Sequence, residues 1–376
     1  MQISYFLKEM VMNMKVKPIG LIIGIILLVA LNDMAMIANP IISHGKPTYG
    51  SSKGTEVLVD GKFNHPAWPV YNGSWFAIKV GEGPTRVFFN WNNPAYSWSD
   101  DIGKATSCKG NMSVPRDYDI LISSNSTNGS NGQWRKVDSV RENSVSERGH
   151  LIDFAGASWV KMSIIVGGGT LDEVEIFDVS RGAEDIWFFP GTSITANTYK
   201  ESIKSSQTFA GLVAAMHPGY YPAMIRGGIG CINSTTFATD ISKYLSMTRN
   251  AHYWAIEMGT NDAWGGNDSG VAAFIKNMQL IIDSCKVSGI HPIIARIIAT
   301  DSLKAGWQVN SVYLKAVDSL TGANNLIPGP DLYTWFKQHP GDLNKDGVHP
   351  NSAGGADIQM LWANQMSSLY NNTNLK

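Results

Sequence analysis

Two segments of the sequence hold side chains suited to nucleophilic catalysis. Ser193 stands in the turn Gly191-Thr192-Ser193, and its hydroxyl can attack a carbonyl carbon once a neighbouring base removes the proton. Asp346 and His349 are three residues apart. Within one turn, that spacing lets the carboxylate reach imidazole Nδ1 and leaves Nε2 free to act as a base. Ser193 is therefore a candidate nucleophile, His349 a candidate base and Asp346 the carboxylate that would orient it.

Two further segments could stabilise negative charge on a reacting oxygen. The run 226–231, Arg-Gly-Gly-Ile-Gly-Cys, is poor in bulky side chains, so its backbone N–H groups can approach a ligand closely. Asn261 follows in Gly259-Thr260-Asn261-Asp262, and its side-chain amide can donate a hydrogen bond to a developing oxyanion.

The elements that must position these segments are strands alternating with helices. Asp185–Phe189 and Ile293–Ile298 are continuous apolar runs, typical of strands buried on both faces. Val271–Cys285 carries apolar residues at three- and four-residue spacing, which predicts a helix, and a last helix is expected over Ser352–Ser368. This alternation predicts a parallel α/β sheet, whose ligand site lies beyond the carboxyl ends of its strands. All four chemical segments are expected at such ends.

The preceding residues, 50–181, are predicted to form an antiparallel β-sandwich of the jelly-roll type. Aromatic and β-branched runs such as Trp75–Val80 and Arg86–Trp91 alternate with turn-forming clusters. Most of the tryptophans in this half are expected in the core. Those in polar loop contexts are the candidates for contact with a sugar: Trp68, Trp98 and Trp134.

Both halves resemble known families. Tyr118–Ser123, Gly132-Gln133-Trp134 and Glu173–Phe177 resemble segments of discoidin-like or galactose-binding-like jelly rolls, which implies a carbohydrate-binding-like domain. The four chemical segments, in this order, resemble the sequence blocks of the SGNH (GDSL-like) hydrolases over about residues 185–370. That second resemblance implies an SGNH-type, flavodoxin-like three-layer domain over residues 182–370 and a serine ester hydrolase that uses no cofactor.

The SGNH resemblance also implies roles for single residues. Ser193 would be the nucleophile, His349 the general base and Asp346 its orienting partner. The oxyanion hole would consist of the Ser193 N–H, an N–H of the glycine turn and the Asn261 side chain. The alignment allows either Gly230 or Cys231 in the glycine turn, and Gly230 is preferred.

One departure from the family pattern concerns the first block, which normally reads Gly-Asp-Ser. Here Thr192 replaces the aspartate, so the local hydrogen bonding and the rate are in question. A degenerate member that retains the scaffold without catalysis stays open. In that interpretation Ser193 is only a helix N-cap, and Asp346 and His349 form a surface turn.

The sequence does not predict a metal site. Asp342–Gly347 matches the start of a calcium-binding EF-hand loop, but position 12 of that loop would be Ala353, where a bidentate glutamate is required. The histidines show no His-x₃-His or Glu-x-x-His spacing. The three cysteines form no Cys-x-x-Cys pair.

The composition bears on which partners the protein binds, and the N-terminal segment bears on its cellular location. Thirty lysines and arginines against 31 aspartates and glutamates give a net charge of −1, without the basic surplus of a nucleic-acid binder. Lys15 and Lys17 precede the apolar run Ile19–Leu31, which is too short to span a bilayer but suits a signal peptide. Residues 1–38 are therefore expected to be a signal peptide or an N-terminal membrane anchor, and the protein to be secreted or displayed at the cell surface.

These features together predict an exported esterase that deacetylates a carbohydrate. Two alternatives remain open at this point. One is an esterase acting on small esters or lipids. The other is a non-catalytic glycan-binding surface protein with a degenerate SGNH domain.

Overall fold

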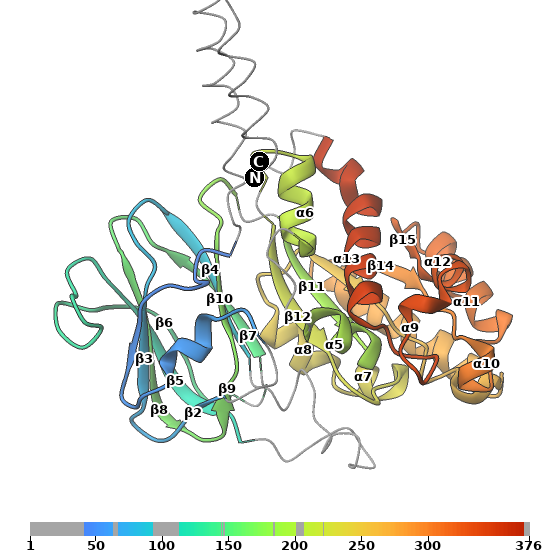
Figure 1. The fold of residues 1–376 in the computed structure, drawn as a ribbon, viewed down its shortest axis with the longest axis horizontal. Coiled ribbons are helices and arrows are strands. Elements are labelled where there is room, and N and C mark those ends of the chain that lie inside the picture. Colours follow the sequence, from blue (N-terminus) through green and yellow to red (C-terminus); the bar gives the residue numbers. More distant parts are fainter. Residues whose placement is uncertain are drawn as a thin grey trace, which may run out of the picture. The chain divides into compact units, whose positions relative to one another are not determined.

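The computed structural model describes residues 41–62, 67–92, 113–143, 145, 147–182, 185–200, 207–220 and 222–371 (Figure 1). These residues belong to one compact unit. The predicted leader, residues 1–38, lies outside them. No helix within the described ranges is both long and apolar enough to cross a bilayer.

The first part of the described chain consists of antiparallel sheets. The larger sheet has the strand order β1-β3-β8-β5-β6 and the smaller has the order β10-β4-β7. A two-stranded ladder, β2-β9, accompanies them. The bounds are β1 Thr48–Gly50, β2 Trp68–Pro69, β3 Trp75–Lys79, β4 Arg86–Asn92, β5 Pro115–Ser123, β6 Arg135–Val140, β7 Glu147–Asp153, β8 Trp159–Gly167, β9 Thr170–Leu171 and β10 Val174–Asp178. A short 3₁₀ helix, η1, spans Thr55–Val59.

The inner faces of these sheets form a core of their own. Alternate residues along β3, β4 and β5 are apolar and fully buried, among them Phe76, Phe89 and Tyr118, as expected for strands with one face toward a core. Trp68 also belongs to this core: it is 1% exposed, and its ring centre lies 5.6 Å from that of Phe76. The prediction that Trp68 contacts a ligand is therefore wrong, because the β2-β9 ladder turns this side chain inward. Trp134 is half-buried just before β6, and Trp98 lies outside the described residues.

The second part is a parallel sheet with the strand order β12-β11-β13-β14-β15. Its strands are β11 Ile186–Gly191, β12 Ala223–Gly228, β13 Tyr253–Ile256, β14 His291–Arg296 and β15 Pro328–Asp331. Counted from β11, this is the order 2-1-3-4-5 of flavodoxin-like sheets. The direction of strand addition reverses between β11 and β13, and in such sheets ligands bind at the carboxyl ends of the strands at that point.

Two groups of helices pack against this sheet. The helices are α5 Ser193–Lys200, α6 Phe209–Met216, α7 Ser234–Thr239, α8 Ile241–Met247, α9 Val271–Val287, α10 Ser302–Ala305, α11 Ser311–Ala323, α12 Leu332–Gln338 and α13 Ser352–Met366. α13 contacts both α5 and α6, and α9 contacts α7 and α11 (Figure 1). Right-handed crossovers require this division, because the chain moves along the sheet in one direction from β11 to β12 and in the other from β12 onward.

The predicted fold class is confirmed: antiparallel sheets precede a parallel sheet with flanking helices. The change from one to the other falls between β10 and β11. The predicted helix 271–285 corresponds to α9, and the predicted helix 352–368 corresponds to α13. The strand expected over 293–298 begins two residues earlier and ends two residues earlier, at His291 and Arg296, because its first pairings are with Tyr253 and Trp254 of β13.

Candidate active site

Ser193 is the first residue of α5, and one residue, Thr192, separates it from the end of β11. Thr192, not Ser193, occupies the N-cap position: its carbonyl accepts from the Ala196 N–H, and its hydroxyl oxygen accepts from the Ile194 N–H at 3.1 Å. The Ser193 hydroxyl is thereby left for other partners. Gly228, at the end of β12, allows α5 to approach, because a Cβ there would lie 2.2 Å from the Ala196 nitrogen.

His349 reaches Ser193 from the other end of this half of the chain. Its Nε2 lies 2.8 Å from Ser193 Oγ, and its Nδ1 lies 2.7 Å from Asp346 Oδ2. Both distances are those of hydrogen bonds. Ser193 is half-buried, whereas the His349 and Asp346 side chains are 23% and 49% exposed, so solvent can reach the group.

The turn that contains Asp346 and His349 holds the histidine in place. The N–H groups of Val348 and His349 both donate to Asp346 Oδ1, at 2.9 and 3.1 Å. Gly347, between Asp346 and Val348, has φ +69°, and a Cβ at this position would lie 2.8 Å from the Asp301 carbonyl oxygen. Partial burial raises the pKa of Asp346, but these two N–H groups and the His349 ring outweigh it and bring that pKa below its usual value. Asp346 is thus kept ionised and aimed at Nδ1.

The glycine turn and the loop after β13 lie beside each other. The Asn261 side-chain amide donates to the Ile232 carbonyl at 2.7 Å, which uses one of its two hydrogens. Asp262 accepts from the Ser234 N–H at 3.1 Å and from its hydroxyl at 2.5 Å. These bonds tie the loop after β12 to the loop after β13.

Backbone donors in the same region have no protein partner. Across the described ranges, no hydrogen bond is recorded for the backbone N–H of Ser193, Gly230 or Cys231. Cys231 has φ +62°, an uncommon conformation for a residue other than glycine. The structure therefore leaves both the Gly230 and the Cys231 N–H open as oxyanion donors beside Ser193.

Glu257 is a residue near this site that the sequence analysis missed. It is 3% exposed, directly after β13, and its carboxylate accepts from the hydroxyls of Thr192 at 3.0 Å and Thr195 at 3.1 Å. Burial raises its pKa, and these hydroxyls moderate the rise. The sequence feature that could have identified it is that Glu257 is the one acidic residue in the otherwise apolar run Tyr253–Met258. Thr192, the residue that departs from the family pattern, is thus joined to a buried carboxylate.

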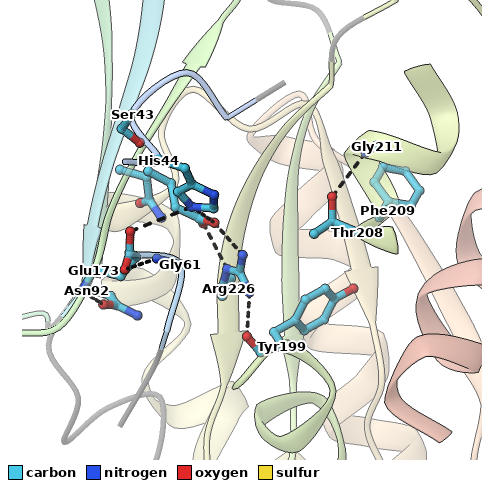
Figure 2. Close-up of polar contacts among 12 residues, drawn as sticks. Ser43, His44, Gly61, Asn92, Glu173, Tyr199, Thr208, Phe209, Gly211 and Arg226 are labelled. Carbon is cyan, nitrogen blue, oxygen red and sulfur yellow. Dashed lines mark hydrogen bonds and ion pairs between the residues drawn. The ribbon is translucent and has the colours of Figure 1, made fainter. Parts of the chain in front are cut away.

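Residues of the sandwich hold β12, the strand that leads into the glycine turn (Figure 2). The Arg226 guanidinium is paired with Glu175 of β10 through Nε at 2.9 Å and through Nη2, and its Nη1 donates to the Tyr199 carbonyl. The backbone N–H of Arg226 donates to the side chain of Glu147 on β7 at 2.9 Å. All these side chains are buried, so the strand that precedes the glycine turn is held by acidic side chains from the first part of the chain.

The described residues contain no cluster of three or more histidine, cysteine, aspartate or glutamate side chains arranged to hold a metal ion. Asp346, which falls in the EF-hand-like run, directs both carboxylate oxygens to the Val348–His349 turn. Cys231 and Cys285 are free thiols, and Cys108 lies outside the described residues.

Comparison with known proteins gives the following. No protein-family model matches the sequence, and no curated protein matches it. Among solved structures, a lipase/acylhydrolase from Enterococcus faecalis matches with a TM-score of 0.42 and 22% identity, over 49% of this chain and 96% of its own. An acetyl xylan esterase from Geobacillus stearothermophilus matches with a TM-score of 0.41 and 15% identity, over 49% and 95%. A chitosan-binding module of a Paenibacillus chitosanase/glucanase matches the N-terminal part with a TM-score of 0.26 and 18% identity, over 36% and 98%.

Proposed function

We propose that this chain is a serine ester hydrolase that removes acetyl groups from a carbohydrate. The observation that carries the proposal is the hydrogen-bonded series Ser193 Oγ, His349 Nε2, His349 Nδ1 and Asp346 Oδ2, with distances of 2.8 and 2.7 Å. A serine so joined to a histidine that a carboxylate orients is the arrangement that generates an alkoxide-like nucleophile at neutral pH.

The reaction proceeds in two stages. The Ser193 oxygen attacks the ester carbonyl carbon while His349 Nε2 takes the hydroxyl proton. The tetrahedral oxyanion is stabilised by the N–H groups of Ser193 and Gly230 and by the Asn261 amide. The C–O bond to the alcohol then breaks, His349 returns the proton to the leaving oxygen, and an acyl-Ser193 remains. A water molecule, deprotonated by His349, releases the acid and restores Ser193.

The carbohydrate substrate is supported by the exposure of the site. Because His349 and Asp346 are partly open to solvent, the alcohol side of the ester can belong to a large molecule. The predicted leader, residues 1–38, fits a protein that meets its substrate outside the cell, and secretion or surface display is part of this proposal.

The test compares Ser193→Ala with the wild-type protein on p-nitrophenyl acetate and on an acetylated polysaccharide. Loss of the nucleophile is expected to lower kcat by about 10³-fold or more. Asn261→Ala is expected to cost about 10²–10³ in kcat, as loss of one oxyanion donor does elsewhere. Ser284→Ala, which removes a hydroxyl from the exposed side of α9, is the control and should retain activity.

Three outcomes would overturn parts of the proposal. Equal turnover by wild type and Ser193→Ala removes Ser193 from the mechanism. Faster hydrolysis of longer acyl esters than of acetylated sugars replaces the carbohydrate deacetylase with a lipid or small-ester esterase. Glycan binding by a wild-type protein without turnover leaves a non-catalytic surface protein.

A further inference from the structure

A polar hollow lies on the sandwich, and none of its lining residues belongs to the candidate active site. Its volume is about 340 Å³, within the range of small-ligand sites. Three segments line it: the end of β5, the start of β6, and the turn between β7 and β8. The lining residues are Ile122, Ser123, Ser124, Gln133, Trp134, Arg135, Ala155, Gly156 and Ala157.

Polar side chains line the hollow, among them those of Ser124, Gln133 and Arg135. Across the part of the chain that the structure describes, no hydrogen bond or ion pair is recorded for the Ser124 hydroxyl, the Gln133 amide or the Arg135 guanidinium. Two neighbouring cations, by contrast, are engaged: Lys136 on β6 and Arg141, just after it, both pair with Asp119, at 2.6 and 2.7 Å. Arg135 is therefore a cation at the hollow that is available to a ligand.

The aromatic wall of the hollow is held rigidly. The Trp134 indole N–H donates to the Asn131 carbonyl at 2.9 Å, and Lys161 Nζ lies 3.7 Å from the Trp134 ring centre. Burial lowers the pKa of Lys161 to about 8. The Asn125 side chain accepts from the Gln133 N–H at 2.8 Å. Because these bonds fix the loop before a ligand arrives, little conformational entropy remains to be lost on binding.

The part of the lining that comes from the turn between β7 and β8 is made of small residues. Ala155, Gly156 and Ala157 carry no long side chains, so they leave room for a ring beside the indole. This turn is joined to β5 by the bond from the Ser158 N–H to the Ser123 carbonyl, at 2.9 Å. An indole, a small-residue wall, a hydroxyl and an amide suit a pyranose ring, which has an apolar C–H face and hydroxyls at its rim.

We propose that this hollow binds one sugar unit of an acidic polysaccharide, with the uronate carboxylate on Arg135. A guanidinium can hold a carboxylate through two parallel hydrogen bonds. Arg135 is the one cation among the described residues that line the hollow, which suits the single negative charge of a carboxylate. This binding site is separate from Ser193 and needs no turnover, so it stands or falls independently of the esterase proposal.

The experiment is native affinity electrophoresis of the full chain in gels containing polygalacturonate, with gels containing its fully methyl-esterified form as the comparison. Polygalacturonate is expected to retard the wild-type protein, and the esterified polymer, which lacks the negative charges, to retard it little. Arg135→Gln is expected to raise the apparent dissociation constant about tenfold or more, since a hydrogen bond to a charged group is lost.

The matched control is Arg116→Gln. Arg116 lies on β5 near the opposite end from the hollow and is exposed, and its loss changes the net charge by the same amount. Ser193→Ala should bind like the wild type. Equal retardation of Arg135→Gln and wild type, equal retardation by the esterified polymer, or loss of binding in Ser193→Ala would each overturn the proposal.

Discussion

Thr192 shows how one substitution in a familiar motif can be accommodated. Its hydroxyl donates to Glu257 and accepts from the Ile194 N–H, so it both caps α5 and satisfies a buried carboxylate. An aspartate at this position could still cap the helix, but it would face Glu257 with a second negative charge. Thr192 and Glu257, the acid that directly follows β13, therefore depend on each other.

Thr192→Asp is expected to be harmful although it would create the Gly-Asp-Ser sequence of the SGNH hydrolases that this segment resembles. Two carboxylates about one hydrogen bond apart in a buried site repel each other, and we expect a loss on the order of 2 kcal/mol in the free energy of unfolding. Turnover should fall as the first turn of α5 shifts. Adding Glu257→Gln should recover part of the lost stability and part of the lost turnover, because the glutamine amide can donate a hydrogen bond to the new aspartate.

The measurement is a double-mutant cycle on melting temperature and on kcat for p-nitrophenyl acetate. Thr192→Ser, which keeps the hydroxyl, is the control and should behave like the wild type. Additive effects of Thr192→Asp and Glu257→Gln would show that the two positions are not coupled.

At the level of elements, β12 links the sandwich to the site. Its Arg226 is 7% exposed and is fixed by Glu175 of β10, and two residues later Gly228 receives the N-terminus of α5. A displacement of β12 would therefore move both the glycine turn that follows it and the segment that carries Ser193. The sandwich acts here as a support for the site.

Glu175→Gln is expected to reduce both stability and turnover. It leaves the buried Arg226 without its carboxylate, and breaking a buried pair in this way costs on the order of 3 kcal/mol. The control is Asp119→Asn, which breaks ion pairs with Lys136 and Arg141, side chains that are 53% and 46% exposed. Such pairs contribute about 1 kcal/mol or less.

Calorimetric melting and kcat, measured side by side, separate the two variants. If Glu175→Gln melts like Asp119→Asn, the buried pair contributes no more than a surface pair. If it melts lower but keeps full turnover, β12 does not transmit the change to the site.

At the scale of the whole molecule, local patterns account for much of the fold and for the candidate triad. Apolar runs of strand length and the three- and four-residue spacing of α9 reflect burial that is repeated along one segment. Asp346 and His349 are close in sequence, so their contact could be predicted from spacing alone. The meeting of His349 with Ser193, 156 positions away, was implied only by the order of the family's blocks.

What local patterns could not show are the polar contacts between distant strands. β7 begins with Glu-Arg-Gly-His, a sequence that is not typical of a buried strand, yet all four residues are buried. Glu147 accepts from the backbone of Arg226, and Arg148 donates to the Ser246 carbonyl at 2.9 Å. The partners lie 79 and 98 positions along the chain, so only the folded structure explains why this strand is polar.

The same buried contacts predict how stability depends on pH. Burial raises the pKa of Glu147 to about 8, although bonds from Asn90 and Arg226 oppose the rise. The folded chain therefore binds this proton more tightly than the unfolded chain. Below about pH 4.5 the resulting stabilisation is fully present, and it is lost as the pH rises through about 8.

Glu147→Gln is expected to remove this part of the pH dependence. The glutamine oxygen can still accept from Asn90 and Arg226, but the side chain carries no charge at any pH. Its melting temperature relative to wild type should therefore rise from about pH 4.5 to about pH 8, where wild-type Glu147 is ionised in the unfolded chain but protonated in the folded one, and should level off above pH 8. Other groups, such as the buried His150, are present in both proteins and cancel in the difference. A difference in melting temperature that stays constant over this range would show that Glu147 does not titrate in the fold, and the carboxylate would then have to be ionised beside Arg226 throughout.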